Sequence, residues 1–213
     1  YWGLQHTQAL NALLIQSSGP LFVALWSLAL FRVRLTGAQA VGIMISLIGV
    51  LVIILRGILA ALTAIELNIG DVTFAAALCV FGLYSALMPR RPKMHALSLM
   101  AFTTGCGALM LLPLVMFEAS RGETLTADTL TISTLVFVVL FPSTLAYLFF
   151  NRSIELIGPN RAAPFFHLVP VFGSVMAIVL LGEKPEMFHL VGYVLVLAGI
   201  FTASRRGSAR PRS

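Results

Sequence analysis

Residues 162–203 read AAPFFHLVPVFGSVMAIVLLGEKPEMFHLVGYVLVLAGIFTA and contain two apolar runs separated by a short charged turn. The first run ends at Leu181 and the second begins at Phe188. A helix needs about 20 largely apolar residues to cross the hydrocarbon core of a bilayer. This stretch therefore predicts two membrane-spanning helices joined by a tight polar turn.

Five further apolar runs precede this pair, each bounded by charged or turn-forming residues. The seven predicted spans cover residues 8–31, 37–55, 72–88, 95–117, 130–150, 162–181 and 188–203. The sequence therefore predicts an all-α integral membrane protein with seven transmembrane helices.

The composition of the chain excludes a water-soluble fold. Hydrophobic residues make up 59% and charged residues 10% of the chain, and the mean hydropathy is +0.97. A soluble protein of this size could not cover so much apolar surface with so few charges. Two cysteines support neither a disulfide framework nor a Cys-rich metal site, and we expect no cofactor.

The basic residues indicate which side each loop faces, because short cytoplasmic loops collect lysine and arginine. Alternating sides with the C-terminal tail inside places eleven of the fourteen basic residues in the cytoplasm and leaves only Arg56, Arg121 and Lys184 outside. Of the eight acidic residues, only Glu155 falls inside. The net charge of +6 therefore indicates membrane topology in place of a nucleic-acid partner.

The chain resembles itself at an offset of 150 residues. Several residues within the spans are identical at this offset: Ala12 and Ala162, Pro20 and Pro170, Phe22 and Phe172, Gly42 and Gly192, and Gly49 and Gly199. Three more spans lie between the copies, so a full repeat has five helices, and an odd number inverts the second copy. We expect residues 1–57 to be the end of a first repeat, 58–207 a complete second repeat and 208–213 a basic cytoplasmic tail.

These residues resemble the drug/metabolite transporter superfamily, specifically its EamA-type members. The similar segments include Pro20-Leu21-Phe22, Gly70-Asp71 and Gly182-Glu183, in the family's order and spacing. The resemblance implies a ten-helix fold of two inverted five-helix repeats, with three helices upstream of Tyr1, and it favours export. The first copy departs from the family pattern because Arg32-Val33 stands where Gly-Glu is usual.

Polar and aromatic residues inside the spans are the candidates for solute binding, since such side chains must face protein or water. Stripes at three- and seven-residue spacing lie in the first, fifth and sixth spans. Our candidate residues are Asn11, Ser18, Tyr84, Tyr147, Phe166 and His167. The alternatives stay open: interhelical hydrogen bonds without a ligand, hydroxyls bonded to their own helix, and a buried neutral histidine.

Prolines and glycines inside the spans predict backbone features. Pro20, Pro142 and Pro170 remove helix hydrogen bonds, and they either kink the helices or let them pivot beside a cavity. The glycine pairs favour close helix packing, as a scaffold or a dimer surface. Every Asp and Glu maps to a loop or a helix end, so we expect no coupling through a buried carboxylate.

The leading functional hypothesis is a secondary transporter, an exporter of small organic solutes such as amino acids, metabolites or drugs, working by alternating access. We expect it in the cell (inner) membrane, in contact with the lipid bilayer and as a possible homodimer. Two alternatives are a non-transporting structural or regulatory membrane subunit and an intramembrane lipid-acting enzyme. The enzyme would need paired acids, a metal cluster or an activated nucleophile at membrane depth, and the sequence suggests none.

The charge distribution predicts a cytoplasmic C-terminus. A fluorescent protein that folds only in the cytoplasm should fluoresce when fused after Ser213, because the basic loops and the tail share that side. Activity of an enzyme tag that works only outside the cytoplasm would reverse the orientation of every span.

Overall fold

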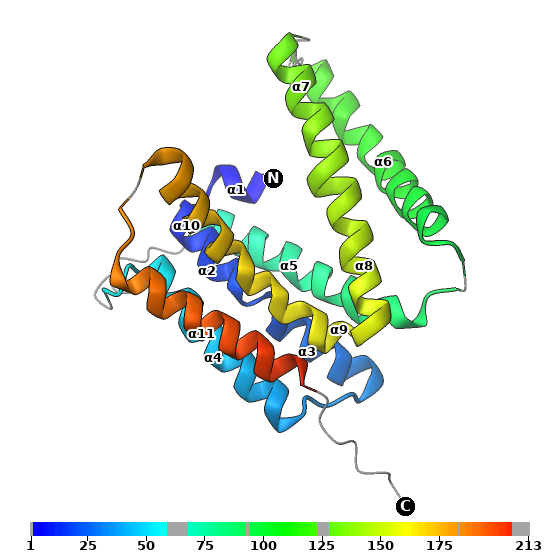
Figure 1. Cartoon of the computed structure of the whole chain (residues 1–213). Helices are drawn as coiled ribbons and strands as arrows, with labels where there is room; N and C mark the ends of the chain where they lie inside the picture. Colours follow the sequence, from blue (N-terminus) through cyan, green and yellow to red (C-terminus); the bar gives the residue numbers. More distant parts are fainter. Residues whose placement is uncertain (1, 59–67, 93, 123–127, 183, 206–213) are drawn as a thin grey trace, which may run out of the picture. The chain divides into compact units, whose positions relative to one another are not determined.

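The computed structural model describes residues 2–58, 68–92, 94–122, 128–182 and 184–205, and within them it contains helices and no strands. In chain order the elements are α1 Trp2–Gln5, α2 Ala9–Ser17, α3 Gly19–Phe31, α4 Gly37–Ile54, α5 Ile69–Leu87, η2 Met88–Arg90, α6 Ala96–Ser120, α7 Thr129–Val138, η3 Val139–Leu145, α8 Ala146–Ile157, α9 Pro159–Ala162, η4 Ala163–His167, α10 Leu168–Leu181 and α11 Met187–Ser204 (Figure 1). The all-α prediction is confirmed.

Seven helical segments among the described residues are long and apolar enough to cross a membrane, as predicted. They are Asn11–Phe31, Gly37–Ile54, Ile69–Arg90, Ala96–Ser120, Thr129–Ile157, Pro159–Leu180 and Met187–Ser204. The third begins three residues earlier than predicted because Asn68 caps α5, and its side chain accepts a hydrogen bond from the Asp71 N–H. The fifth ends seven residues later than predicted: α8 continues through Asn151 and Arg152 to Ile157.

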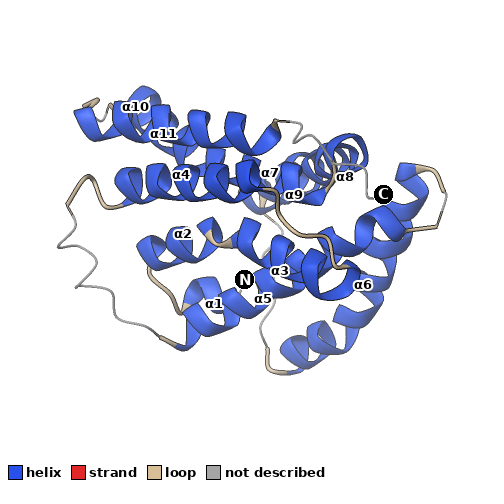
Figure 2. Ribbon diagram, turned by 90° about the horizontal axis from the view of Figure 1, so that it is seen from below, coloured by secondary structure: helices blue, strands red, loops and turns tan. Residues whose placement is uncertain are grey.

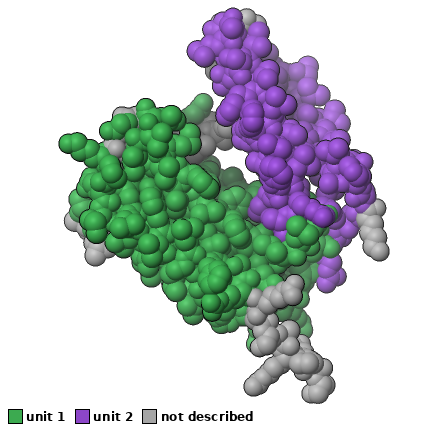
Figure 3. Space-filling model, viewed as in Figure 1, with its two compact units in different colours: residues 1–89, 154–213 green, residues 90–153 purple. Residues whose placement is uncertain are grey.

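The chain forms two compact units, which Figure 3 colours separately. One contains residues 1–89 and 154–213, and the other contains residues 90–153. In the second unit, α6 and α7 expose many apolar side chains, such as Met110 and Leu130, which are 79% and 74% exposed. Outward-facing apolar side chains are what a helix in lipid presents.

Asp128 caps α7 in this second unit. Its carboxylate accepts a hydrogen bond from the Thr131 N–H at 2.7 Å. The Thr131 side chain and backbone N–H together hold the pKa of Asp128 below its usual value. The N-terminus of this span is thus fixed by an ionised side chain outside the apolar segment.

The helices α4 and α11 pack along a seam of small residues and lie side by side in Figures 1 and 2. A Cβ added at Gly49 would lie 2.7 Å from the Val196 nitrogen and 2.8 Å from the Gly192 oxygen. A Cβ at Gly42 would overlap the backbone of Gly199 and Ala203. Only glycine allows the two backbones to approach this closely, so the glycines act here as a packing scaffold within the chain.

The contacts along this seam are reciprocal. Gly42 lies against Gly199, and Gly49 lies against Gly192. At the offset of 150 these residues exchange places, since Gly42 corresponds to Gly192 and Gly49 to Gly199. Contacts in which i meets j′ and j meets i′ are the pattern that a two-fold axis produces. The apolar core beside the seam contains Val50, Ile53, Val171, Val196 and Ile200.

Helix ends at the same offset also share a backbone conformation. Arg32 ends α3 with φ 54°, and Gly182 ends α10 with φ 71°. Both values are in the left-handed region, which glycine adopts at little cost and arginine does not. The departure from the family's Gly-Glu at Arg32-Val33 therefore leaves the chain path unchanged and costs local strain.

The seam predicts opposite effects of one substitution at two glycines. Gly42→Ala should lower the free energy of unfolding by about 1–3 kcal/mol, because a methyl group there forces the backbones of α4 and α11 apart. Gly173→Ala, where an added Cβ meets nothing within 4 Å, should be neutral or stabilise by up to about 1 kcal/mol through helix propensity. Unfolding in detergent measures both, and equal effects would contradict the seam.

Candidate functional site

Five of the six predicted solute-binding residues lie in one unit of the structure. Asn11, Ser18, Tyr84, Phe166 and His167 belong to the unit of residues 1–89 and 154–213. Tyr147 lies on α8 in residues 90–153 and is 42% exposed. The structure therefore relates the first five to one another, and Tyr147 only to its own unit.

The first span is interrupted between α2 and α3. The Ser18 N–H ends α2 by bonding to the carbonyls of Gln16 and Ile15, and Pro20 in the first turn of α3 has no N–H to donate. The Leu21 N–H bonds to the Ser18 carbonyl at 2.9 Å, so it is not used by Ser17. The carbonyl of Ser17 is therefore free for a partner outside its helix, while the Ser18 hydroxyl donates to the Ile15 carbonyl of its own helix.

The sixth span is interrupted at the corresponding place. Residues Ala163–His167 form the 3₁₀ segment η4 between α9 and α10, with Pro164 near its start. Pro170 is the third residue of α10, so its missing N–H falls in the first turn after the interruption. Pro20 and Pro170 thus occupy equivalent positions, each directly after a break in a membrane helix.

His167 joins the two interruptions and is fully buried. Its Nε2 lies 2.8 Å from the Ser17 carbonyl oxygen, and because a carbonyl only accepts, Nε2 carries the hydrogen. Its Nδ1 lies 2.6 Å from the Ser46 hydroxyl of α4. Both ring nitrogens therefore form hydrogen bonds with protein groups. This arrangement agrees with the alternative of a buried histidine that does not contact solute.

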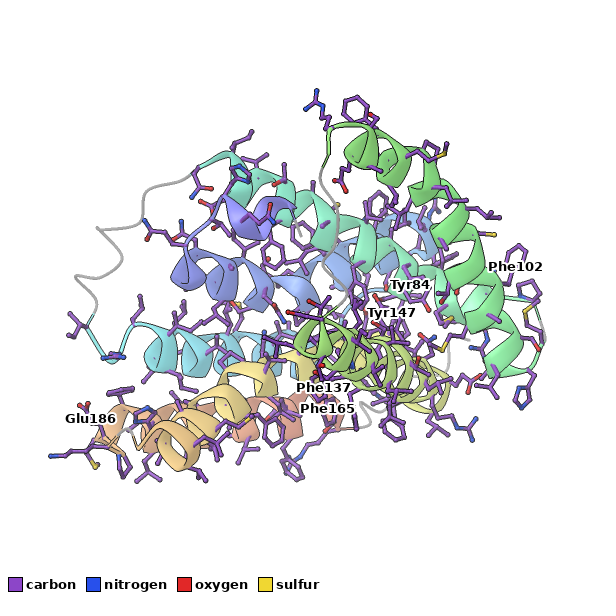
Figure 4. The ribbon with its side chains drawn as sticks, turned by 90° about the horizontal axis from the view of Figure 1, so that it is seen from above. Tyr84, Phe102, Phe137, Tyr147, Phe165 and Glu186 are labelled. Atoms are coloured by element: carbon purple, nitrogen blue, oxygen red, sulfur yellow. The ribbon has the colours of Figure 1, made fainter. Side chains whose placement is uncertain are left out.

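An aromatic cluster lies beside this junction. The Phe166 ring meets the Phe81 ring of α5 edge to face, with centroids 5.5 Å apart, and Phe81 lies 6.1 Å from the Tyr84 ring. Two predicted residues are thus brought together by Phe81, which the sequence analysis did not single out. Figure 4 labels Tyr84 of α5 and Phe165 of η4. Phe165, the neighbour of Phe166, is 45% exposed.

Asn11 is held by a carboxylate that the sequence analysis placed outside the spans. Asp71, 3% exposed in the first turn of α5, accepts hydrogen bonds from Asn11 Nδ2 and from the Asn68 N–H, both at 2.9 Å, and from the Thr7 hydroxyl. Asp71 lies at a helix end, as expected, but it is buried, which the sequence did not predict. The pattern Asn68-x-x-Asp71, a capping box, was the available signal.

Pro142 lies in the other unit and distorts its helix locally. It falls inside η3, a π-helical segment from Val139 to Leu145, in which the Thr144 hydroxyl donates to the Val139 carbonyl at 2.7 Å. Wider turns of this kind accommodate a residue that cannot donate a backbone hydrogen bond. The third predicted proline is therefore placed at a backbone irregularity as well.

The fold and these contacts define a multi-pass membrane protein in which polar groups gather at two interrupted helices. The model of the EamA-like transporter family matches residues 1–55 and 68–205. The chain belongs to this family, within the drug/metabolite transporter superfamily. The family resemblance read from the sequence is confirmed.

Several relatives are similar over almost the whole chain. A Bacillus subtilis protein named "Uncharacterized transporter YyaM" is 29% identical over 95% of this chain and 66% of its own length. The "Probable terminal-alkyne amino-acid exporter" of Streptantibioticus cattleyicolor is 29% identical over 99% of this chain and 69% of its own. The "Probable amino-acid metabolite efflux pump" of Salmonella typhimurium is 30% identical over 90% and 66%. The chain thus spans about two thirds of the length of these relatives.

A solved crystal structure has a similar fold. It superposes with a TM-score of 0.74 and covers 96% of this chain and 71% of its own. The sequences are 19% identical, so the similarity concerns the fold.

The contacts of Asp71 predict an order of stabilities. Asp71→Ala removes the acceptor of the hydrogen bonds from Asn11, Thr7 and Asn68 and should lower the melting temperature more than Asp71→Asn, which keeps one side-chain oxygen. Asp128→Ala, which removes an exposed helix cap, is the matched control and should have the smaller effect. Thermal unfolding in detergent ranks the three. An equal loss at the two positions would show that the contacts with Thr7 and Asn11 contribute little.

Proposed function

We propose that this chain is the greater part of a secondary transporter that exports small organic solutes by alternating access. The observation that carries the proposal is the meeting of two interrupted membrane helices at Ser17 and His167. Interrupted helices near the membrane centre free backbone groups for polar ligands and give segments that can move separately. Membership of the transporter family and the printed names of its relatives support the same function.

The architecture we propose is a pair of inverted five-helix repeats. Residues 1–57 would supply the last helices of the first repeat, 58–207 the second repeat, and 208–213 a cytoplasmic tail outside the described residues. The reciprocal glycine contacts, the equivalent breaks before Pro20 and Pro170, and the paired left-handed helix ends support a two-fold relation. In such a carrier the two repeats exchange conformations as access alternates.

The solute we propose is an amino acid or a related small metabolite. Two relatives are named for amino-acid export. The rings of Phe81, Tyr84 and Phe166 offer an apolar wall, and Asn11 and Ser18 remain proposed polar contacts. Tyr147, which belongs to the other unit, remains a separate candidate for solute binding. Mixed walls of this kind fix the orientation of a small ligand through a few polar groups.

The location we propose is the cell (inner) membrane, with the C-terminus in the cytoplasm. The described ends of the spans support it, because Arg32, Arg90, Arg161 and Arg205 fall on one side in the alternating count. A homodimer, if it forms, would use surfaces other than the glycine seam, which is filled by α4 and α11 of one chain.

Two adjacent phenylalanines test the site. The complete protein, purified into liposomes, should exchange a labelled neutral amino acid for unlabelled solute. Phe166→Ala should raise the solute concentration for half-maximal exchange by roughly 2- to 10-fold, the value of one aromatic contact. Phe165→Ala should leave it unchanged, because that ring faces outward.

The two possible failures are distinguishable. If the protein moves no amino acid, peptide, sugar or aromatic cation, the transport proposal is wrong. If it transports but Phe166→Ala and Phe165→Ala behave alike, transport stands and the aromatic wall is wrong. Equal amounts of folded protein in the liposomes, measured by size-exclusion chromatography before reconstitution, are required for either conclusion.

A further inference from the structure

His167 links three elements at a place that is closed to solvent in this structure. Its ring is fully buried, and its partners come from α2 and α4 while the ring itself belongs to η4. Ser46 is also fully buried, and Ser17 is 6% exposed. A solute could touch the ring only after at least one of these contacts opened.

The two hydrogen bonds require a defined arrangement of protons. In the neutral ring, Nε2–H donates to Ser17 and Nδ1 accepts from the Ser46 hydroxyl. The same hydroxyl lies 3.0 Å from the Ile43 carbonyl of its own helix. It therefore has an alternative acceptor when His167 moves away, and α4 loses little if the contact opens.

The bond to Ser17 has no such alternative within α2. Leu21 donates to Ser18, and Pro20 cannot donate at all, so no backbone N–H of the break reaches the Ser17 carbonyl. An unpaired carbonyl in the membrane interior is unfavourable. The break between α2 and α3 therefore depends on a side chain supplied by the other interrupted span.

The positions of the two residues in the sequence are also informative. Ser17 and His167 are 150 residues apart, which is the offset of the internal similarity. A residue touches its own counterpart only at the two-fold axis that relates two copies. Both breaks therefore meet at the place about which the two halves would exchange conformations.

We propose that His167 is a positioning residue, a lock that holds the two helix breaks against each other and sets the balance between access states, and that it does not bind solute. The proposal rests on the transport function proposed above. Closed, the lock joins α2 to η4 through Ser17 and fixes η4 on α4 through Ser46. When both hydrogen bonds break, α3 and α10, which each have a proline in their first turn, become free to move at the same time.

Amide hydrogen exchange of the complete protein in nanodiscs tests the lock without any solute. His167→Leu removes both contacts at similar volume and should speed exchange by about 10-fold in residues 18–22 and 163–169, the factor for losing about one net hydrogen bond. Exchange in residues 192–203 of α11 should stay within about 2-fold, because the glycine seam is untouched. His167→Gln keeps a donor in place of Nε2 and should stay close to the parent.

A serine pair provides the matched control. Ser46→Ala removes the second arm of the lock and should speed exchange in residues 163–169 more than in 18–22. Ser204→Ala removes a hydroxyl that donates to the Phe201 carbonyl of its own helix and should change neither segment. A uniform rise along all helices in His167→Leu, or no rise at the two breaks, would overturn the lock.

Solute exchange separates the lock from a binding role. His167→Leu should change the maximal rate of exchange and His167→Gln should restore it. Equal impairment in both variants, with amide exchange unchanged, would assign His167 to the solute site and overturn the proposal. If the parent moves no solute, the transport proposal fails, and the amide exchange still decides whether the two breaks are coupled.

Discussion

The structure depends on one constraint, which is that a backbone carbonyl in the membrane interior needs a hydrogen-bond partner. At the break between α2 and α3 the Ser17 carbonyl receives no backbone N–H, because the Leu21 N–H bonds to Ser18 and Pro20 has no N–H to donate. The side chain that satisfies it comes from η4, more than a hundred residues later. Two irregular segments that would each be unfavourable alone thus stabilise one another, and this mutual dependence brings the sixth span against the first.

The glycine seam performs the complementary task of keeping the surrounding helices fixed. Lipid and apolar side chains are equally hydrophobic, so close van der Waals contact must replace the hydrophobic effect between α4 and α11. Glycines at 42, 49, 192 and 199 provide that contact without side chains in the way. A closely packed pair of helices beside two interrupted ones suits the proposed alternating access, because motion can be confined to the interruptions.

Sequence patterns were sufficient for the spans, the glycine packing and the family, since each depends on residue type and spacing alone. They were not sufficient for the contacts that decide the site. Asp71 was placed at a helix end, but its burial depends on hydrogen bonds from Thr7, Asn11 and the Asn68 backbone, which the sequence alone does not reveal. In the sequence Phe81 resembles any apolar residue of α5, and only the structure shows its edge-to-face contact with Phe166. The partners of His167 could not be predicted, because the sequence does not show which backbone carbonyl the break beside Pro20 leaves without a donor.

In the two-fold arrangement proposed above, the contact between Ser17 and His167 accounts for the difference between the two copies at this position. On a two-fold axis, identical side chains would compete for one space, and two histidines would meet ring against ring. A serine opposite a histidine removes the conflict, because the Ser17 hydroxyl donates to the Leu14 carbonyl at 2.6 Å and leaves its own carbonyl to the ring. In the proposed arrangement, one large side chain then lies at the axis and bonds to both breaks. In that arrangement the difference between Ser17 and His167 allows the two breaks to be joined by a hydrogen bond.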